Sequence, residues 1–248
     1  MGTVRELNAR AVRAVRVDLA AAFRMAVRLE LHEGVCNHFS AMLDRKRFLL
    51  NHYGLHWSEV TASNLIALDA AGNVLEGEGE IEKTAFYIHS RIHLAHPRAA
   101  CVLHTHMPYA TVLTLLEGGR LEMVEQNALR FADDIAYDDE YNGLVVDTAE
   151  GDRLARVLGA KRVLFLANHG VIVVGATVAE AFDSLYYLER ACRLQVLARA
   201  TGLPLRKVRP EVVRETYRLI AADTPKYAGA HFSALKRILD REEPDYSR

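Results

Sequence analysis

The sequence predicts an α/β protein in which helices cover a mixed, largely antiparallel sheet. Segments with helical and with strand periodicity alternate along the 248 residues, as they do where helices pack on a sheet. Several strand segments follow one another directly, as in hairpins, which favours antiparallel pairing over a doubly wound nucleotide fold. Neither GxGxxG nor GxxxxGK(S/T), the phosphate-binding patterns of nucleotide folds, occurs in the chain. Half of the residues are hydrophobic, so we expect a single domain over residues 1–248, with residues 204–248 as its helical extension.

The elements of the first half follow from composition and turn residues. Ala, Leu and Arg dominate residues 4–34 without a helix breaker before Gly34, which predicts a long helix. Residues 36–79 then predict short strands with turns. KRFLLNHYG and SNLIALDAAGNVLEG both have the composition of β segments, with a hairpin turn at residues 69–73. Residues 81–95 predict a second helix that ends before Pro97.

The second half predicts buried strands that alternate with helices. CVLHTH is an apolar run typical of a buried strand, and VLFLANHGVIVVG predicts two strands broken at residues 168–170. Helices are predicted at residues 108–116 and 149–158. A long helix has Thr177 as its N-cap and ends at Gly202, and one or two more helices complete the chain.

Composition excludes several classes of partner. The 31 Lys and Arg residues nearly balance the 32 Asp and Glu residues, so neither nucleic acid nor an anionic membrane is an expected partner. No segment approaches the ~18 apolar residues of a membrane span, and the first residues lack the pattern of a signal peptide. The three cysteines form no CxxC pair, which indicates free thiols in a reducing compartment. We expect a cytoplasmic protein that acts on a small molecule.

Three histidines predict a metal site. His104 and His106 are two residues apart on a predicted strand, so both rings lie on the same face. This pair alone fits a metal site and two buried core histidines equally well. His169 favours the metal, because it lies at the break between two apolar strands and precedes Gly170, where the chain can turn sharply. Three imidazoles with open positions beside them are typical of a Lewis-acid site.

Two further patterns are interpreted without a metal. His89 and His93 are four apart on a predicted helix, but no Glu follows His89 as in the zinc-protease pattern. We interpret them as partly buried helix histidines rather than a second metal site. An acidic stretch lacks the ligand spacing of an EF-hand loop and is interpreted as a solvated loop. It contains Asp133, Asp134, Asp138, Asp139 and Glu140.

The order of several blocks between residues 30 and 195 resembles the class II aldolase/adducin superfamily, in particular its adducin-like bacterial branch. The blocks are EGVCNHFSAML, FLLNHYGLHWSEVTASNLIALDAAGNVLEG, AFYIHSRIHLAHPRAACVLHTH, QNALRF, LANHGVIVVGATVAEAF and LERACRLQV. The resemblance implies a three-layer α/β/α domain with a central, mostly antiparallel sheet, assembled as a homotetramer with active sites at subunit interfaces. It also implies a divalent metal on His104, His106 and His169, with zinc expected first and manganese or iron as alternatives.

The chain departs from the family at the acid/base residue. By this resemblance the Glu that the aldolases use falls on Ala85, so Glu82, nearly one helical turn earlier, and His38 are the candidate proton-transfer residues. The resemblance to the family's anion-binding loops makes three further residues candidates for substrate contact. These are Asn37, Asn51 and Gly54. Because the small residues of the phosphate pocket are only partly kept, a non-phosphorylated, aromatic substrate is favoured over a sugar phosphate.

These observations lead to one principal function and two alternatives. The principal function is a metal-dependent lyase that cleaves a C–C bond of a small hydroxy or oxo acid by decarboxylation or retro-aldol chemistry. The metal would stabilise the enolate-like charge that develops next to the breaking bond. The first alternative is a non-heme iron oxygenase that uses the same three histidines. The second is a non-catalytic interaction module, as in adducins.

Overall fold

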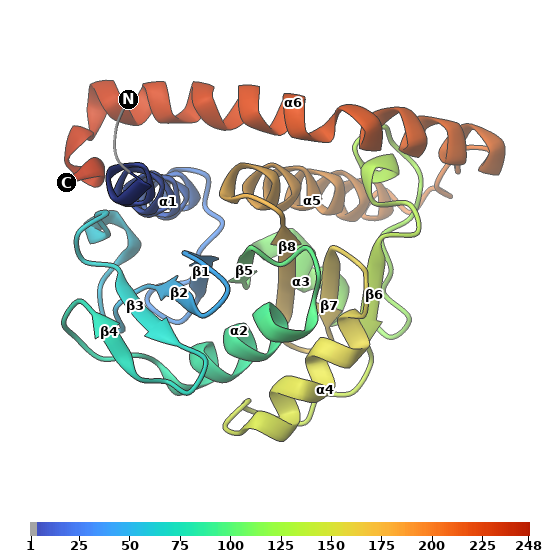
Figure 1. Ribbon diagram of the computed structural model, residues 1–248. Coiled ribbons are helices and arrows are strands. Elements are labelled where there is room, and N and C mark those ends of the chain that lie inside the picture. Colours follow the sequence, from blue (N-terminus) through green and yellow to red (C-terminus); the bar gives the residue numbers. More distant parts are fainter. Residues whose placement is uncertain (1–3) are drawn as a thin grey trace.

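An eight-stranded sheet forms the centre of the computed structural model, which describes residues 4–248 (Figure 1). The strand order is β4-β3-β2-β1-β5-β8-β7-β6. The strands are β1 His38–Met42, β2 Arg47–Leu50, β3 Ile66–Asp69, β4 Val74–Glu76, β5 Cys101–Thr105, β6 Ile135–Asp138, β7 Val163–Leu166 and β8 Gly170–Gly175. Every neighbouring pair is antiparallel except β6 and β7. The predicted mostly antiparallel sheet is therefore confirmed.

Helices cover both faces of the sheet. The α-helices are α1 Val4–Arg28, α2 Lys83–Ala95, α3 Pro108–Thr114, α4 Thr148–Leu158, α5 Val178–Arg199 and α6 Pro210–Glu242, with short 3-10 helices at Trp57–Glu59, Ala128–Phe131 and Pro244–Ser247. Helices α1 and α5 pack on one face, and α2 and α4 pack on the other (Figure 1). The predicted α/β/α layering is confirmed, and α6 lies across the outer side of α1 and α5. Within residues 4–248, none of the helices is long and apolar enough to cross a membrane.

The strand register decides which side chains lie on each face. Phe39 of β1 and Leu103 of β5 are opposite each other and join the core under α1 and α5. His38 precedes Phe39, and His104 follows Leu103, and these two histidines are also opposite each other. Because successive side chains of a strand point to opposite faces, both histidines point to the face beside α2 and α4. Ser40 and the apolar Val102, which are opposite each other, lie on the same face. The two imidazoles therefore lie together on the α2 side of the sheet.

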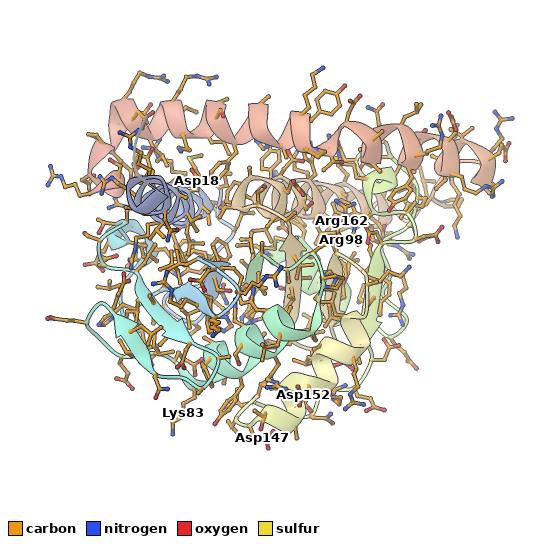
Figure 2. All side chains as sticks on the ribbon, viewed as in Figure 1. Asp18, Lys83, Arg98, Asp147, Asp152 and Arg162 are labelled. Atoms are coloured by element: carbon orange, nitrogen blue, oxygen red, sulfur yellow. The ribbon has the colours of Figure 1, made fainter. Side chains whose placement is uncertain are left out.

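Strand β6 has no counterpart in the sequence-based prediction and corrects it. The acidic stretch predicted to be a solvated loop forms β6, and its Asp134 and Asp138 are buried. Their charges are balanced by distant arginines: Arg162 binds Asp134, and both guanidinium Nη atoms of Arg153 donate to Asp138, at 2.9 and 2.6 Å. Figure 2 shows Arg162 close to Arg98, which lies 3.7 Å from the same Asp134 carboxylate. Strand β1, in which polar and apolar residues alternate, lies within the residues 36–79 that were predicted to form short strands.

Helix ends agree with the prediction at some positions and differ at others. Thr177 caps α5 as predicted, because its side chain accepts a hydrogen bond from the backbone N–H of Glu180. The first helix ends at Arg28 rather than Gly34, since Glu30 adopts a left-handed conformation with φ of 56° that stops it. The tail forms one long helix, α6, which continues through Pro225.

Candidate metal centre

The three predicted ligands converge at one end of β5 and β8. His104 is the penultimate residue of β5, His106 follows the end of that strand, and His169 lies in the turn between β7 and β8. One ligand nitrogen from each ring lies within 4.8 Å of the others. Gly170 permits this approach, because a Cβ there would lie 2.5 Å from the backbone oxygen of Thr105 and 2.7 Å from the ring of His106. The structure thus brings together the three histidines that sequence spacing singled out.

Hydrogen bonds fix the tautomers of two of these rings. Nδ1 of His104 donates to the backbone carbonyl of Val171 at 3.0 Å, and Nδ1 of His106 donates to the carboxylate of Glu33 at 2.5 Å. In a neutral ring with Nδ1 protonated, Nε2 carries a lone pair. The two Nε2 atoms lie 3.2 Å apart, so two lone pairs face each other. This donor set fits a divalent cation, which would accept both lone pairs.

Burial keeps two of the candidate ligands, His104 and His169, neutral. Burial lowers the pKa of His104 well below its usual range, and the neighbouring histidines, His169 first, lower it further. Burial, followed by the nearby His106, lowers the pKa of His169 to about 4. Because metals bind the unprotonated imidazole, both rings are ready for a cation at neutral pH.

His38 lies directly beside this cluster. Its ring stacks on that of His104 with the centroids 4.8 Å apart, and its Nδ1 lies 2.7 Å from Nε2 of His89 on α2. Burial lowers the pKa of His38 to about 3, with further lowering from His169 and His106. A predicted proton-transfer residue is therefore adjacent to the candidate ligands and uncharged.

Asn37 has a hydrogen-bond donor without a protein partner. Its side-chain oxygen accepts from the backbone N–H groups of Glu33, at 2.9 Å, and His106, at 3.3 Å. These two bonds fix the orientation of the amide, and its Nδ2 is buried without an acceptor among residues 4–248. An acceptor atom of a bound molecule would satisfy that donor.

The other two predicted substrate contacts are placed differently. Asn51 is buried just after β2, and its side-chain oxygen accepts from the backbone N–H of Phe39 at 3.4 Å. Gly54 lies in an exposed turn with φ of 86°, which is the left-handed region that favours glycine. Asn51 thus supports the strand that carries His38, and Gly54 shapes the following turn.

Glu82 and Ala85 form the start of α2. Glu82 is the N-cap, and its carboxylate accepts from the backbone N–H of Ala85 at 2.7 Å and from the hydroxyl of Thr84. Ala85 is buried in an apolar cluster with residues of β2 and β3, including Phe48 and Leu50. The position that resembles the aldolase Glu is therefore part of the core, and the nearby carboxylate is engaged as a helix cap.

Sequence reasoning did not identify three groups around the site. Glu33 binds His106, Ser40 and His89 connect to His38, and the ring of Tyr141 lies 6.4 Å from that of His169. The i, i+4 pair of helix histidines was a signal for the second group. Neither Glu33 nor Tyr141 carries a spacing pattern that could have revealed it.

The chain belongs to the class II aldolase/adducin family. Its residues 17–196 match the family model described as "Class II Aldolase and Adducin N-terminal domain". A Caulobacter vibrioides protein named for aldolase class 2 is 34% identical over 236 residues, which is 94% of this chain and 91% of that protein. The crystal structure of an aldolase II superfamily protein from Pseudomonas syringae superposes with a TM-score of 0.91 at 33% identity, with both chains covered completely.

The chain is similar in fold to an aldolase and in sequence to an adducin. An L-fuculose 1-phosphate aldolase from Glaciozyma antarctica superposes with a TM-score of 0.84 at 24% identity over 95% of this chain and 92% of that one. Mouse alpha-adducin is 34% identical over 196 residues, which is 76% of this chain but 26% of the adducin. Family membership therefore leaves catalysis to be argued from the residues of the site.

Proposed function

We propose that this protein is a metal-dependent lyase that cleaves a C–C bond of a small hydroxy or oxo acid by decarboxylation or retro-aldol chemistry. The observation that carries the proposal is the convergence of His104, His106 and His169, with the Nε2 lone pairs of the first two facing each other. A divalent cation held there would act as a Lewis acid toward a substrate oxygen next to the breaking bond. Zinc suits three imidazoles best, with manganese or iron as alternatives.

Proton transfer is assigned to His38. The ring is neutral and stacks on His104, whereas the carboxylate of Glu82 is engaged as a helix cap. The unpartnered Nδ2 of Asn37 would donate to a substrate oxygen and orient it. Since His38 and Tyr53 occupy places near the family's phosphate-binding residues, we favour a non-phosphorylated, aromatic substrate.

We further propose a homotetramer with its active sites at subunit interfaces. Large apolar side chains are exposed on the loop that follows β6, which also carries Tyr141 near His169. They include Leu144 and Val146. A second copy of the chain that covers this loop would bury them and close the site from water.

A non-catalytic interaction module is the second candidate function. The observation in its favour is the apolar Ala85, which packs in the core where the aldolases of the family have their acid/base Glu. The identity with mouse alpha-adducin supports the same alternative. The presence or absence of a bound metal separates the two candidates.

Elemental analysis of the purified protein tests the proposal. We expect close to one zinc or manganese per chain, lost in His104→Ala and in His169→Ala. His231→Ala is the matched control, because His231 binds Asp183 on the other side of the sheet and should leave the metal content unchanged. Iron with metal-dependent oxygen consumption would instead indicate the oxygenase. A folded wild-type chain that remains metal-free after reloading would refute the lyase and favour the interaction module.

A further inference from the structure

A chain of buried hydrogen bonds leads away from the candidate metal centre. Nδ1 of His38 lies 2.7 Å from Nε2 of His89, and Nδ1 of His89 lies 2.5 Å from the hydroxyl of Ser40. The same hydroxyl lies 2.7 Å from Nε2 of His93, whose Nδ1 lies 2.6 Å from the backbone carbonyl oxygen of Ala99. His38, His89 and Ser40 are all at least 97% buried, so water does not compete for these bonds.

The carbonyl at the end of the chain determines the direction of every bond. A carbonyl oxygen can only accept, so Nδ1 of His93 is protonated, and in the neutral ring its Nε2 is an acceptor. The single hydroxyl proton of Ser40 is then donated to His93, and Ser40 must accept from Nδ1 of His89. This leaves Nε2 of His89 as an acceptor. It accepts from Nδ1 of His38.

The surroundings of the three imidazole rings favour their neutral state. Burial lowers the pKa of His93 to about 4 and that of His89 well below its usual range. The ring of Phe48 packs against His93, with the centroids 5.3 Å apart. The hydrogen-bond partners of the three rings are a hydroxyl, a carbonyl and one another, with no carboxylate to stabilise an imidazolium.

We propose that Ser40, His89 and His93 are positioning residues that hold His38 in the tautomer with Nδ1 protonated and Nε2 unprotonated. Because Nδ1 is bonded to His89, Nε2 is the nitrogen of the His38 ring that remains for a molecule bound beside His104, on which the ring stacks. His38 then presents an acceptor to the site, whereas the other tautomer would present a donor. The hydrogen-bonded series from His38 through His89 and Ser40 to His93 is called the relay below. Its purpose rests on the proposed lyase function, in which the Nε2 lone pair of His38 would take a proton from the substrate.

Nitrogen-15 spectroscopy of the imidazoles tests the relay without substrate or metal. The metal-free protein is labelled with 15N-histidine, and long-range 1H–15N correlations at neutral pH distinguish protonated from unprotonated ring nitrogens. A His38→Gln variant assigns the His38 signals. We expect Nδ1 of His38 to be protonated and Nε2 to be unprotonated in the wild type.

Matched hydroxyl variants show whether Ser40 sets the tautomer. Ser40→Ala removes the link between His89 and His93, so the His38 nitrogens should shift toward the averaged values of mixed tautomers. Ser90→Ala is the control, because Ser90 is adjacent to His89 and buried but its hydroxyl has no partner. Ser40→Thr keeps the hydroxyl and should restore the wild-type pattern. If Ser40→Ala does not fold, His93→Gln, at a less buried position, breaks the same chain and should give the same mixture.

The outcomes separate this relay from the proposed function. A protonated Nε2 on His38 in the wild type, or an unchanged tautomer in both Ser40→Ala and His93→Gln, would refute the relay even if the protein binds metal. Conversely, an ordered His38 tautomer in a protein that never binds metal would support the relay and refute the lyase.

Discussion

Glu33 is expected to strengthen metal binding through His106. The Glu33 carboxylate accepts a hydrogen bond from Nδ1–H of His106 at 2.5 Å. This bond fixes the orientation of the ring and makes Nε2 a stronger ligand for a cation. Loss of such a partner typically costs 10- to 100-fold in metal affinity. The Glu33 side chain is 62% exposed, so solvent screens its charge and the lower end of that range applies. We therefore expect Glu33→Gln to weaken zinc binding about tenfold, equivalent to about 1.4 kcal/mol.

Competition against a fluorescent zinc chelator at fixed pH and ionic strength measures this loss. Glu78→Gln is the matched control, because it removes the same charge from an exposed loop residue and should leave affinity within twofold. Raising the ionic strength should reduce the difference between wild type and Glu33→Gln, since part of it is electrostatic. Equal zinc affinities for Glu33→Gln and wild type at low salt would refute the role assigned to the carboxylate.

Three further predictions concern stability and the shape of the site. Arg153→Met leaves the carboxylate of Asp138 buried without its charge partner, so chemical denaturation should show a free energy of unfolding lower by about 3–5 kcal/mol. A decrease below about 1 kcal/mol would contradict the buried pair. Gly170→Ala should lower the free energy of unfolding by about 1–3 kcal/mol and weaken zinc binding, because its Cβ would lie too close to backbone atoms. Gly229→Ala, in open space on α6, should leave the free energy of unfolding unchanged or raise it. Equal effects of the two substitutions would contradict the close approach at Gly170. The pKa of His93 is about 4 when folded and near its ordinary 6.5 when unfolded, so the unfolded chain binds more protons between these values. His93 alone should therefore lower the stability by roughly 2–3 kcal/mol as pH drops from about 6.5 to about 4, and other buried histidines such as His38 and His169 add to the loss. His93→Gln should remove its own share from the pH dependence of the denaturation midpoints; an unchanged slope would contradict it.

Local patterns predicted most of the fold because the elements concerned are stabilised by their own residues. The hairpin at residues 69–73 and the capped helix after Thr177 are examples, since turn chemistry and capping act within a few positions. Strand β6 could not be predicted in this way. Asp134 and Asp138 are buried only because arginines 28 and 15 residues further along the chain neutralise them. Without knowledge of those arginine partners, an acidic stretch is expected to lie in solvent.

In the candidate site, too, the features set by local sequence were predicted and those set by distant segments were not. The i, i+2 spacing of His104 and His106 and the His169–Gly170 pair predicted a cluster of three imidazoles, because strand geometry alone puts the first two on one face. The contacts of Glu33 and His38 depend on register between segments far apart in sequence.

Two departures from the aldolase pattern are mutually consistent. An Ala at position 85 removes a carboxylate from α2 and completes an apolar cluster, which by itself would leave the centre without a proton carrier. His38 places an imidazole on β1 opposite His104, so the proposed proton carrier lies beside the candidate ligands on a different element. An imidazole in that place needs a defined tautomer to act as an acceptor, and the hydrogen bonds through His89 supply one. The buried network ends at His38, whose ring stacks on the candidate ligand His104, and each buried polar group in it must be satisfied at a cost to packing. A polar network kept at that place supports the proposed lyase, with His38 as its proton carrier, over the proposed interaction module.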